Sequence, residues 1–407
     1  MFSRRIQATD KIISASTFTS SRRSAALTRP PFLFMPANRW VSSFRKIRTD
    51  ETLTGTPLAN YNKMVPPVFS MDSTASRSRS ATAQKPQAVF AKPVLLTASD
   101  TARTALVKVL RASLQHIVGN LEVADQGTSP ETVHQLRVAV GRMRVLLSAF
   151  RKTIDDKERL FLSGELKWFQ QQLGPAREWD VSIEQVLAPL AKQEQSSKGI
   201  ARLRELANLH RTAAHHHAGN AIHSRRLQRL LQRLERLLAL LPHWENHGES
   251  SAARTSRAWN TQQRRLAQPA LKLAHKTLKA RHVRTQALGN KVTNLDDDEL
   301  HKLRIRVRKL RYTSELFCGV WRKKGNRKTT DRYLACLKKL QFALGSAHDS
   351  TVAIRLIESI RSEAGTECAR DVDGICARIA ARHAHDREQL HELWRQFVKI
   401  EKFWKEK

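Results

Sequence analysis

Apolar residues recur at three- and four-residue spacing along most of the chain beyond residue 98, a period typical of amphipathic helices. The stretch 300–312 shows it most clearly, because Leu303, Val307 and Leu310 share one helical face. The opposite face carries a histidine and arginines, namely His301, Arg304, Arg308 and Arg311.

The stretch 133–144 repeats this pattern upstream. One constant shift along the chain aligns His134 with His301, Arg137 with Arg304 and Phe150 with Phe317. The same shift aligns Arg144 with Arg311, so His134, Arg137 and Arg144 repeat the basic stripe, and Arg142 lies in the same stretch. The repeat indicates two related halves, each built around one such helix.

The periodicity predicts an all-α fold, because sustained two-residue alternation and Asn-Gly hairpin signals are missing from the sequence. The expected helices begin near Ser99-Asp100 and then follow at 129–154, 155–173, 179–192, 198–220, 224–241, 266–286, 296–317, the segment ending at Leu344-Gly345, 347–362 and 370–400.

Capping residues mark several of these boundaries. Ser129-Pro130-Glu131 and the acidic run 296–299 are typical helix starts. Leu173-Gly174-Pro175 and Leu344-Gly345 predict helix ends. Each end is followed by a basic residue and an acid, Arg177-Glu178 in one half and His348-Asp349 in the other. The repeat thus extends beyond the two basic helices.

Residues 1–95 differ in composition from the rest of the chain. They are rich in Ser, Thr, Arg and Pro and lack sustained periodicity. Two interpretations remain open: a disordered leader or an extension before a later start such as Met71, and an organellar transit peptide within residues 1–40. We expect one domain over 96–407, with half one at about 97–242, a polar linker at 243–264 and half two at about 265–407.

The charge of the chain points to an anionic partner. Lys and Arg number 72 against 37 Asp and Glu, a formal net charge of +35. Positive charges in such excess repel one another, so DNA, RNA, an anionic membrane and inorganic polyphosphate are all candidate partners. The alternative is that the arginines merely cover solvent-exposed faces. The four cysteines form no CxxC pair, which is typical of free thiols in a reducing compartment. No apolar run in the sequence is long enough for a membrane span.

The basic stripes favour a phosphate-type ligand over a solvated surface. Solvated helices usually interleave Arg with Glu or Asp, whereas 301–311 and 134–144 contain no acid. The histidine of each stripe stands in the first helical turn, where free N–H groups and the helix dipole favour anions. The alternative is a histidine satisfied by a neighbouring helix.

These two stretches, with Tyr312 and Glu315, resemble the paired signature of the CHAD family, the conserved histidine α-helical domain. The resemblance implies two pseudo-symmetric four-helix bundles facing each other across a basic groove or channel that binds inorganic polyphosphate. The binding positions it implies are His134, Arg137, Arg142, Arg144, His301, Arg304, Lys309 and Arg311. Helical geometry adds Arg308, and the motifs after Leu-Gly add Arg177 and His348.

Two positions depart from the family pattern. Gly141 stands where the family usually has a basic residue, and Glu178 where Asp is commoner. Because Gly141 aligns with Arg308, we expect the second basic helix to contribute more of the affinity, so that Arg304→Ala weakens binding more than Arg137→Ala.

We expect a binding module without a cofactor or metal rather than an enzyme. The chain lacks an ExExK run and a GxxxxGK[ST] loop. His348-Asp349 and His385-Asp386 leave a metal-dependent phosphohydrolase as one alternative, and nucleic-acid binding is another, although the stripes lack interleaved aromatic residues. The cluster of His210, His215, His216, His217 and His223 is interpreted as helix surface, because consecutive side chains diverge by about 100°. We expect a cytoplasmic location at polyphosphate granules, or an organelle if residues 1–40 are a transit peptide.

Overall fold

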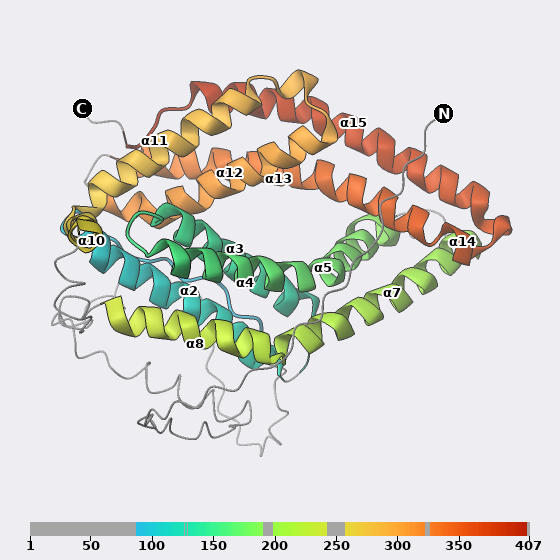
Figure 1. The fold of residues 1–407 in the computed structure, drawn as a ribbon. Coiled ribbons are helices and arrows are strands. Elements are labelled where there is room, and N and C mark those ends of the chain that lie inside the picture. The colour runs from blue at the N-terminus through green and yellow to red at the C-terminus, as the bar shows by residue number, and fades with distance from the viewer. Residues whose placement is uncertain are drawn as a thin grey trace, which may run out of the picture. The chain divides into compact units, whose positions relative to one another are not determined.

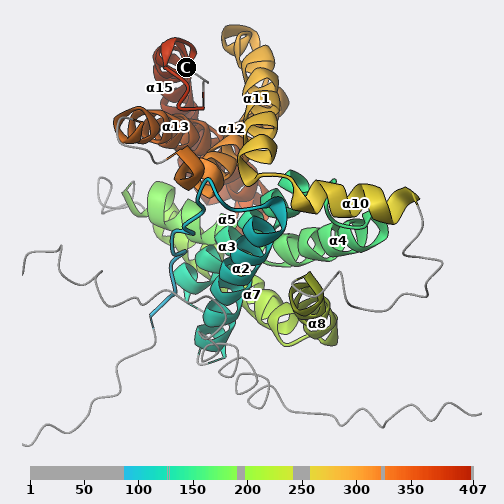
Figure 2. The same ribbon diagram turned by 90° about the vertical axis from the view of Figure 1, so that its left-hand side faces the viewer.

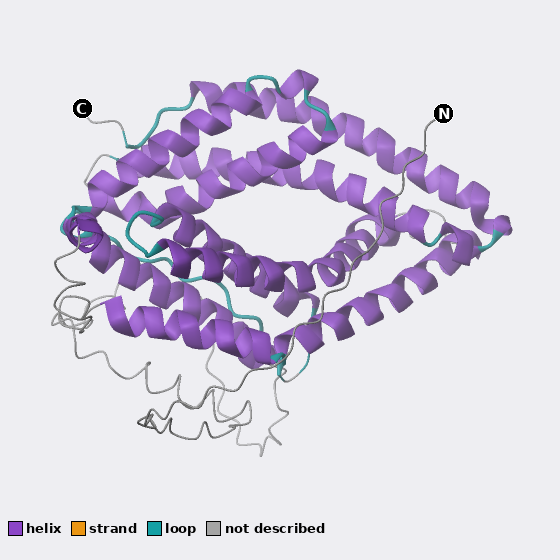
Figure 3. Cartoon of the chain, in the orientation of Figure 1, coloured by secondary structure: helices purple, strands orange, loops and turns teal. Residues whose placement is uncertain are grey.

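The computed structural model describes residues 87–125, 127, 129–189, 198–241, 257–321 and 326–404. Within these ranges the chain is helical and forms no strand, apart from an isolated bridge between Thr101 and Pro269 (Figure 3). The predicted all-α class is therefore confirmed. None of the described helices is long and apolar enough to cross a membrane.

The first half of the fold is a series of helices that, with one exception, begin close to the predicted starts. They are α2 (Ala102–Ala124), α3 (Pro130–Ala149), α4 (Asp156–Gln172), α5 (Gly174–Val181), the π-helix η2 (Ser182–Leu187), α7 (Lys198–Ile222) and α8 (Arg225–Leu240). The exception is α5, which begins at Gly174, directly after α4, where a start near 179 was expected. Ser129 caps α3 by accepting a hydrogen bond from Thr132 N, and Asp155 caps α4. The cap of α2 is Thr101 rather than Ser99 or Asp100, because Asp100 accepts hydrogen bonds from Thr97 N and Lys108 Nζ instead.

The second half follows a similar plan. It comprises α10 (Arg257–Ala267), α11 (Ala270–Gly289), η4 (Val292–Asn294), α12 (Asp297–Phe317), η5 (Cys318–Trp321), α13 (Arg327–Ser359), α14 (Arg361–Ala364), η6 (Thr366–Cys368) and α15 (Ala369–Lys399). Asp296 and Glu299 form a capping box at the start of α12, as the acidic run predicted. The single helix expected over 266–286 is two helices that meet at Pro269, and residues 257–264, expected in the linker, lie in α10.

The predicted helix end at Leu344-Gly345 is wrong, because α13 runs without interruption from Arg327 to Ser359. A glycine ends a helix efficiently when it adopts a positive φ, and Gly345 is not among the positive-φ glycines of the described chain. Leu344 and Ala347 are both buried, so the apolar stripe of the helix continues through the glycine. Packing therefore decides the length of α13.

The helices form two groups that follow the two halves, except that α10 of the second half packs on α2 of the first (Figures 1 and 2). α3 and α12, the helices of the sequence repeat, pack against each other, and Phe150 and Phe317 at their ends meet with ring centroids 5.9 Å apart. A second contact between the halves is an apolar core that joins α5, η2 and α7 to α13, α14, η6 and α15, with Trp179, Leu203 and Ile357 among its members. The pseudo-twofold relation of the halves stays a prediction.

An extended segment, residues 87–97, packs along both halves before α2 begins. Asn120 holds the backbone of Val89, donating to Val89 O at 2.8 Å and accepting from Val89 N at 3.0 Å. Gly319 leaves the space that the segment needs, because a Cβ there would lie 2.5 Å from Leu96 O. The packed part of the chain thus begins before residue 96, while residues 1–86 of the expected leader lie outside the described residues.

Candidate functional site

The two helices of the repeat hold their basic residues on the face opposite the core. In α12, Leu303, Val307 and Leu310 are fully buried. Acidic residues in the first turn, Asp297, Asp298 and Glu299, stabilise the positive end of the helix dipole. Burial of the apolar stripe therefore fixes the rotation of the helix and with it the direction of Arg304 and Arg308.

Arginines from three helices converge at one place, which we call the basic cluster. It consists of Arg137 and Arg144 of α3, Arg177 of α5, and Arg304 and Arg308 of α12. The pKa of Arg137 is lowered to about 10, chiefly by burial and also by the charges of Arg308, Arg304 and Arg177, against the opposing effect of Glu178. Burial and Arg308 lower the pKa of Arg144 in the same way. The cluster thus concentrates positive charge from both halves.

Gly174 explains how Arg137 fits into this cluster. A Cβ at Gly174 would lie 3.3 Å from Arg137 Nη1, so a larger residue would push the guanidinium aside. The same nitrogen donates to Gln170 O at 3.1 Å, near the end of α4. The Leu-Gly motif of the first half therefore makes room for the guanidinium of Arg137 and does more than mark a helix boundary.

Three histidines lie at the edge of the basic cluster in their neutral form. His301 Nδ1 and His348 Nδ1 are 3.3 Å apart, so one nitrogen donates to the other. The pKa of His348 is lowered to about 3, chiefly by burial and also by Arg304 and His301. Burial also lowers the pKa of His301 and of His134, the latter with help from Arg177. Neutral imidazoles can donate a hydrogen bond to a phosphoryl oxygen without adding charge.

Two carboxylates accompany the arginines. Asp349 Oδ1 lies 3.9 Å from Arg304 Nη2, beyond ordinary hydrogen-bond length. Glu178 of α5 forms an ion pair with Arg355 of α13 at 2.8 Å and so links the two halves. The two acids were noted in the sequence only as parts of dipeptides.

Two of the sequence-predicted binding residues, Arg142 and Arg311, face a carboxylate instead of the cluster. Glu315 accepts from Arg142 Nη2 at 2.6 Å and from Arg311 Nη1 at 2.7 Å. Both guanidiniums also lie over the ring of Tyr312, at 5.0 and 4.8 Å from its centroid. We call these four residues the Glu315 clamp. Three of them, Arg142, Tyr312 and Glu315, also line a cavity of about 220 Å³ beside α2 whose other walls are mostly apolar.

Gly141 lies at the contact between α3 and α12. A Cβ at this position would sit 3.8 Å from Tyr312 Cε2. Position 141 therefore faces the Glu315 clamp rather than mirroring Arg308 in the basic cluster. The stripe of α3 lacks the charge that Arg308 gives to α12.

Lys309 connects the basic cluster to a second buried arginine that the sequence did not single out. The pKa of Lys309 is lowered by partial burial and then by Arg281 and Arg144. Arg281 of α11 donates to Lys309 O at 3.1 Å and Val145 O at 3.3 Å, and also to Thr313 Oγ1, so it ties α11 to both repeat helices. Its helix carries many basic residues, and only the fold distinguishes this one.

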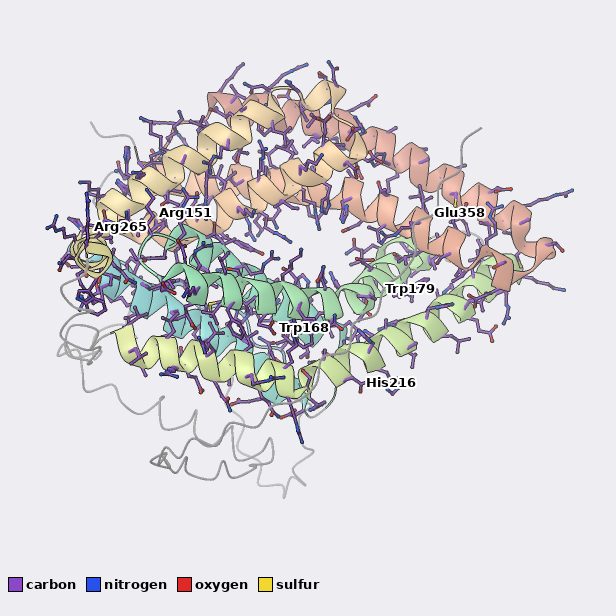
Figure 4. The ribbon with its side chains drawn as sticks, in the orientation of Figure 1. Arg151, Trp168, Trp179, His216, Arg265 and Glu358 are labelled. Atoms are coloured by element: carbon purple, nitrogen blue, oxygen red, sulfur yellow. The ribbon has the colours of Figure 1, made fainter. Side chains whose placement is uncertain are left out.

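The five histidines near residue 215 do not form one site. His215 bonds to Asp180 at 3.0 Å, His210 to Glu363 at 3.1 Å and His217 to Gln172 at 2.8 Å. His223 lies 3.6 Å from Asp125, and His216 is exposed (Figure 4). Each thus has its own surroundings, and within the described ranges no group of three or more His, Cys, Asp or Glu is arranged to hold a metal ion.

Comparisons with known proteins agree with the fold. The sequence model of the CHAD domain matches residues 108–358. The chain is similar to the crystal structure of the CHAD domain from the plant Ricinus communis, with 24% identity, a TM-score of 0.61, and coverage of 76% of this chain and 96% of that one. It is also similar to PptA from Streptomyces chartreusis, with 18% identity, a TM-score of 0.52, and coverage of 74% and 100%. A comparison with curated proteins gives no match.

Proposed function

The chain belongs to the CHAD domain family, and we propose that it binds inorganic polyphosphate at the basic cluster. The observation that carries the proposal is the convergence of Arg137, Arg144 and Arg177 from one half on Arg304 and Arg308 from the other. Guanidiniums held this close repel one another, and a polyanion between them turns the repulsion into attraction.

Polyphosphate suits this cluster chemically. It is a flexible chain of phosphates without bases, so it needs cations along its length and no groups that read sequence. Arginine binds phosphoryl oxygens through two parallel N–H groups, which favours arginine over lysine here. The neutral His301–His348 pair supplies one donor at the edge of the same cluster, the Nε2–H of the ring that accepts at Nδ1. We expect the affinity to fall steeply with salt, by analogy with counterion release from nucleic acids.

We propose a binding module rather than an enzyme. The metal-dependent alternative would use His348 and Asp349, but His348 contacts His301, and the charges of Arg304, Arg308 and Arg355 bear on it. Such surroundings repel a divalent cation. Release of phosphate from polyphosphate in the presence of Mg²⁺ or Mn²⁺, lost on His348→Ala, would favour the enzyme instead.

Nucleic acid is the second candidate ligand, and the geometry of the aromatic residues disfavours it. Single-strand binders stack bases on exposed aromatic rings. Tyr312 is buried between two guanidiniums in the Glu315 clamp, and Phe150 and Phe317 pack on each other in the core. Competition tests the choice: if duplex DNA or RNA displaces long-chain polyphosphate at equal phosphate concentration, the proposal fails.

Arginine substitutions test the site itself. We expect Arg304→Ala to weaken polyphosphate binding about tenfold or more, because a charge-assisted contact contributes about 1.5–3 kcal/mol. Arg137→Ala should cost less, since Arg308 has no counterpart at Gly141. Arg395→Ala, an exposed arginine of α15, is the matched control and should change the affinity little.

Titration calorimetry with long-chain polyphosphate measures all three variants. Equal losses for Arg304→Ala and Arg395→Ala would show that the cluster is not the site. A larger loss for Arg137→Ala than for Arg304→Ala would leave the site in place but contradict the predicted asymmetry.

The proposal extends to the location of the protein. A polyphosphate-binding chain should collect at cytoplasmic polyphosphate granules, and imaging of a C-terminally tagged chain beside stained polyphosphate tests this. If residues 1–40 act as a transit peptide, the tagged chain will be found in an organelle, and removal of these residues will return it to the cytoplasm.

A further inference from the structure

Asp349 of α13 is a carboxylate placed among the arginines that would bind the ligand. Its Oδ1 lies 3.9 Å from Arg304 Nη2, and the charges of Arg177 and Arg137 also act on it. It therefore faces guanidiniums from α12, α5 and α3 at once. A carboxylate in this position presents the same kind of oxygen to the arginines as a phosphate would.

Glu178, the other acid near the cluster, has a different role. It accepts from Arg355 Nη2 at 2.8 Å and so has a partner outside the cluster. Asp349 has no comparably short ion pair in the described chain, because its contact with Arg304 is longer than a hydrogen bond. Glu178 also acts on Arg137 and Arg304, but its short ion pair is with Arg355, whereas the ion pair of Asp349 is with a cluster arginine, Arg304.

We propose that Asp349 is an internal counter-anion of the basic cluster, which neutralises part of its charge when polyphosphate is absent and competes with the ligand for Arg304. The proposal rests on polyphosphate being the ligand of this site. On this proposal Asp349 lowers the affinity for polyphosphate, whereas the arginines around it raise the affinity. Removing the charge of Asp349 therefore tightens binding.

The surroundings of Asp349 also predict how its effect depends on pH. Burial, the first cause, and Glu178 raise its pKa, while Arg304, Arg177 and Arg137 lower it, and the net shift is upward from the usual value. Besides α12 and α5, the elements α15 and η2 pack against α13. Asp386 of α15 accepts from Ser346 Oγ, and Glu184 of η2 is exposed. A bound phosphate next to the carboxylate would raise the pKa further.

The affinity for polyphosphate therefore depends on the protonation of Asp349. A group whose pKa rises on binding takes up a proton, so the affinity increases as the pH falls from the pKa of the complex toward that of the free protein. His301 and His348 change in the same direction, because their pKa values are lowered in the free protein and a polyanion would raise them. A variant is needed to separate the carboxylate from the imidazoles.

The experiment compares Asp349→Asn with Asp331→Asn. Asp331 lies on the same helix, is mostly exposed and pairs loosely with Arg327 at 3.8 Å, so its variant makes the same change in net charge away from the cluster. Calorimetry with long-chain polyphosphate is run from pH 4 to pH 8, with circular dichroism to show that each variant is folded. We expect Asp349→Asn to bind about tenfold more tightly than the parent at neutral pH, the effect of about 1.4 kcal/mol of removed repulsion.

The difference between Asp349→Asn and the parent should shrink toward acidic pH, where the parent carboxylate is protonated. Asp331→Asn should follow the parent throughout. Weaker or unchanged binding of a folded Asp349→Asn at neutral pH would overturn the inference, since Asp349 would then be positioning Arg304. Failure of the parent itself to bind polyphosphate at any pH would instead overturn the proposed function.

Discussion

The Glu315 clamp gives a prediction in which charge and geometry have opposite effects. Replacing Glu315 by Ala removes the acceptor of two short hydrogen bonds, to Arg142 and Arg311, and leaves both guanidiniums without it. Removing an acid also makes the protein more basic. Charge alone would therefore strengthen polyanion binding, whereas loss of the contact between α3 and α12 would weaken it.

The magnitude follows from the burial of the clamp. The side chains of Glu315, Arg142 and Arg311 are 25%, 31% and 16% exposed, so the pairs are neither fully solvated nor dry. Charge-assisted hydrogen bonds in such surroundings contribute about 1.5–3 kcal/mol, and the new cost of unpaired guanidiniums is limited by their access to water. We expect Glu315→Ala to lose about 2–3 kcal/mol of stability, a fall in Tm of about 3–6 °C for a domain of this size.

Thermal unfolding and calorimetry with polyphosphate measure the two effects. We expect a lower Tm together with weaker binding, because Arg137 and Arg304 lie on the two helices that the clamp joins. Glu392→Ala removes an exposed acid of α15 and is the control, with no expected change in either quantity. A double-mutant cycle with Arg142→Ala should give a coupling energy of about 1–2 kcal/mol. An unchanged Tm, or tighter binding by Glu315→Ala, would refute the structural role of the clamp.

Two further predictions concern stability. The pKa of His348 is lowered to about 3 from an ordinary value near 6.5, so between these pH values unfolding takes up a proton and stability should fall as the pH drops. Acid unfolding followed by fluorescence should show this fall, and His348→Gln should reduce the pH dependence. Asn120→Ala removes both hydrogen bonds to the backbone of Val89 and should lower the free energy of unfolding in urea by about 2 kcal/mol. Asn208→Ala, at an exposed position, should lower it by almost nothing. Equal losses would show that the segment 87–97 does not contribute to the fold.

Local chemistry made much of the fold predictable. Ser129, Asp155 and the capping box at Asp296 start helices where the sequence placed them, because these residues satisfy free backbone N–H groups within their own turn. The stop expected at Gly345 failed because its burial partners, which lie on other helices, favour a continuous α13. Local signals thus located helix boundaries where no other contact competed, and they failed at Asp100, which bonds to Lys108 instead of capping α2, and at Gly345, where packing continues the helix.

The same division applies to the candidate site. The stripes at Arg137 and Arg304 could be recognised from helical spacing alone, and the structure brings them together. Four-residue spacing already allows Arg311 to pair with Glu315, but it could not show that Arg142 of α3 would share this carboxylate or that Arg311 would also reach Gln341 on another helix. Arg281 carried no signal at all, because its contacts with Lys309 and Val145 join segments far apart in the chain.

The basic cluster has a consequence for the lifetime of the protein. Because its arginines come from both halves, their mutual repulsion acts across the contact between α3 and α12 and favours separation of the halves. A ligand that binds only the folded chain stabilises it in proportion to the logarithm of its concentration above Kd. The folded state would then gain stability only when polyphosphate is present. Cells rich in the polymer would retain this protein, and cells that have consumed it would lose the protein to proteolysis, without any change in its synthesis.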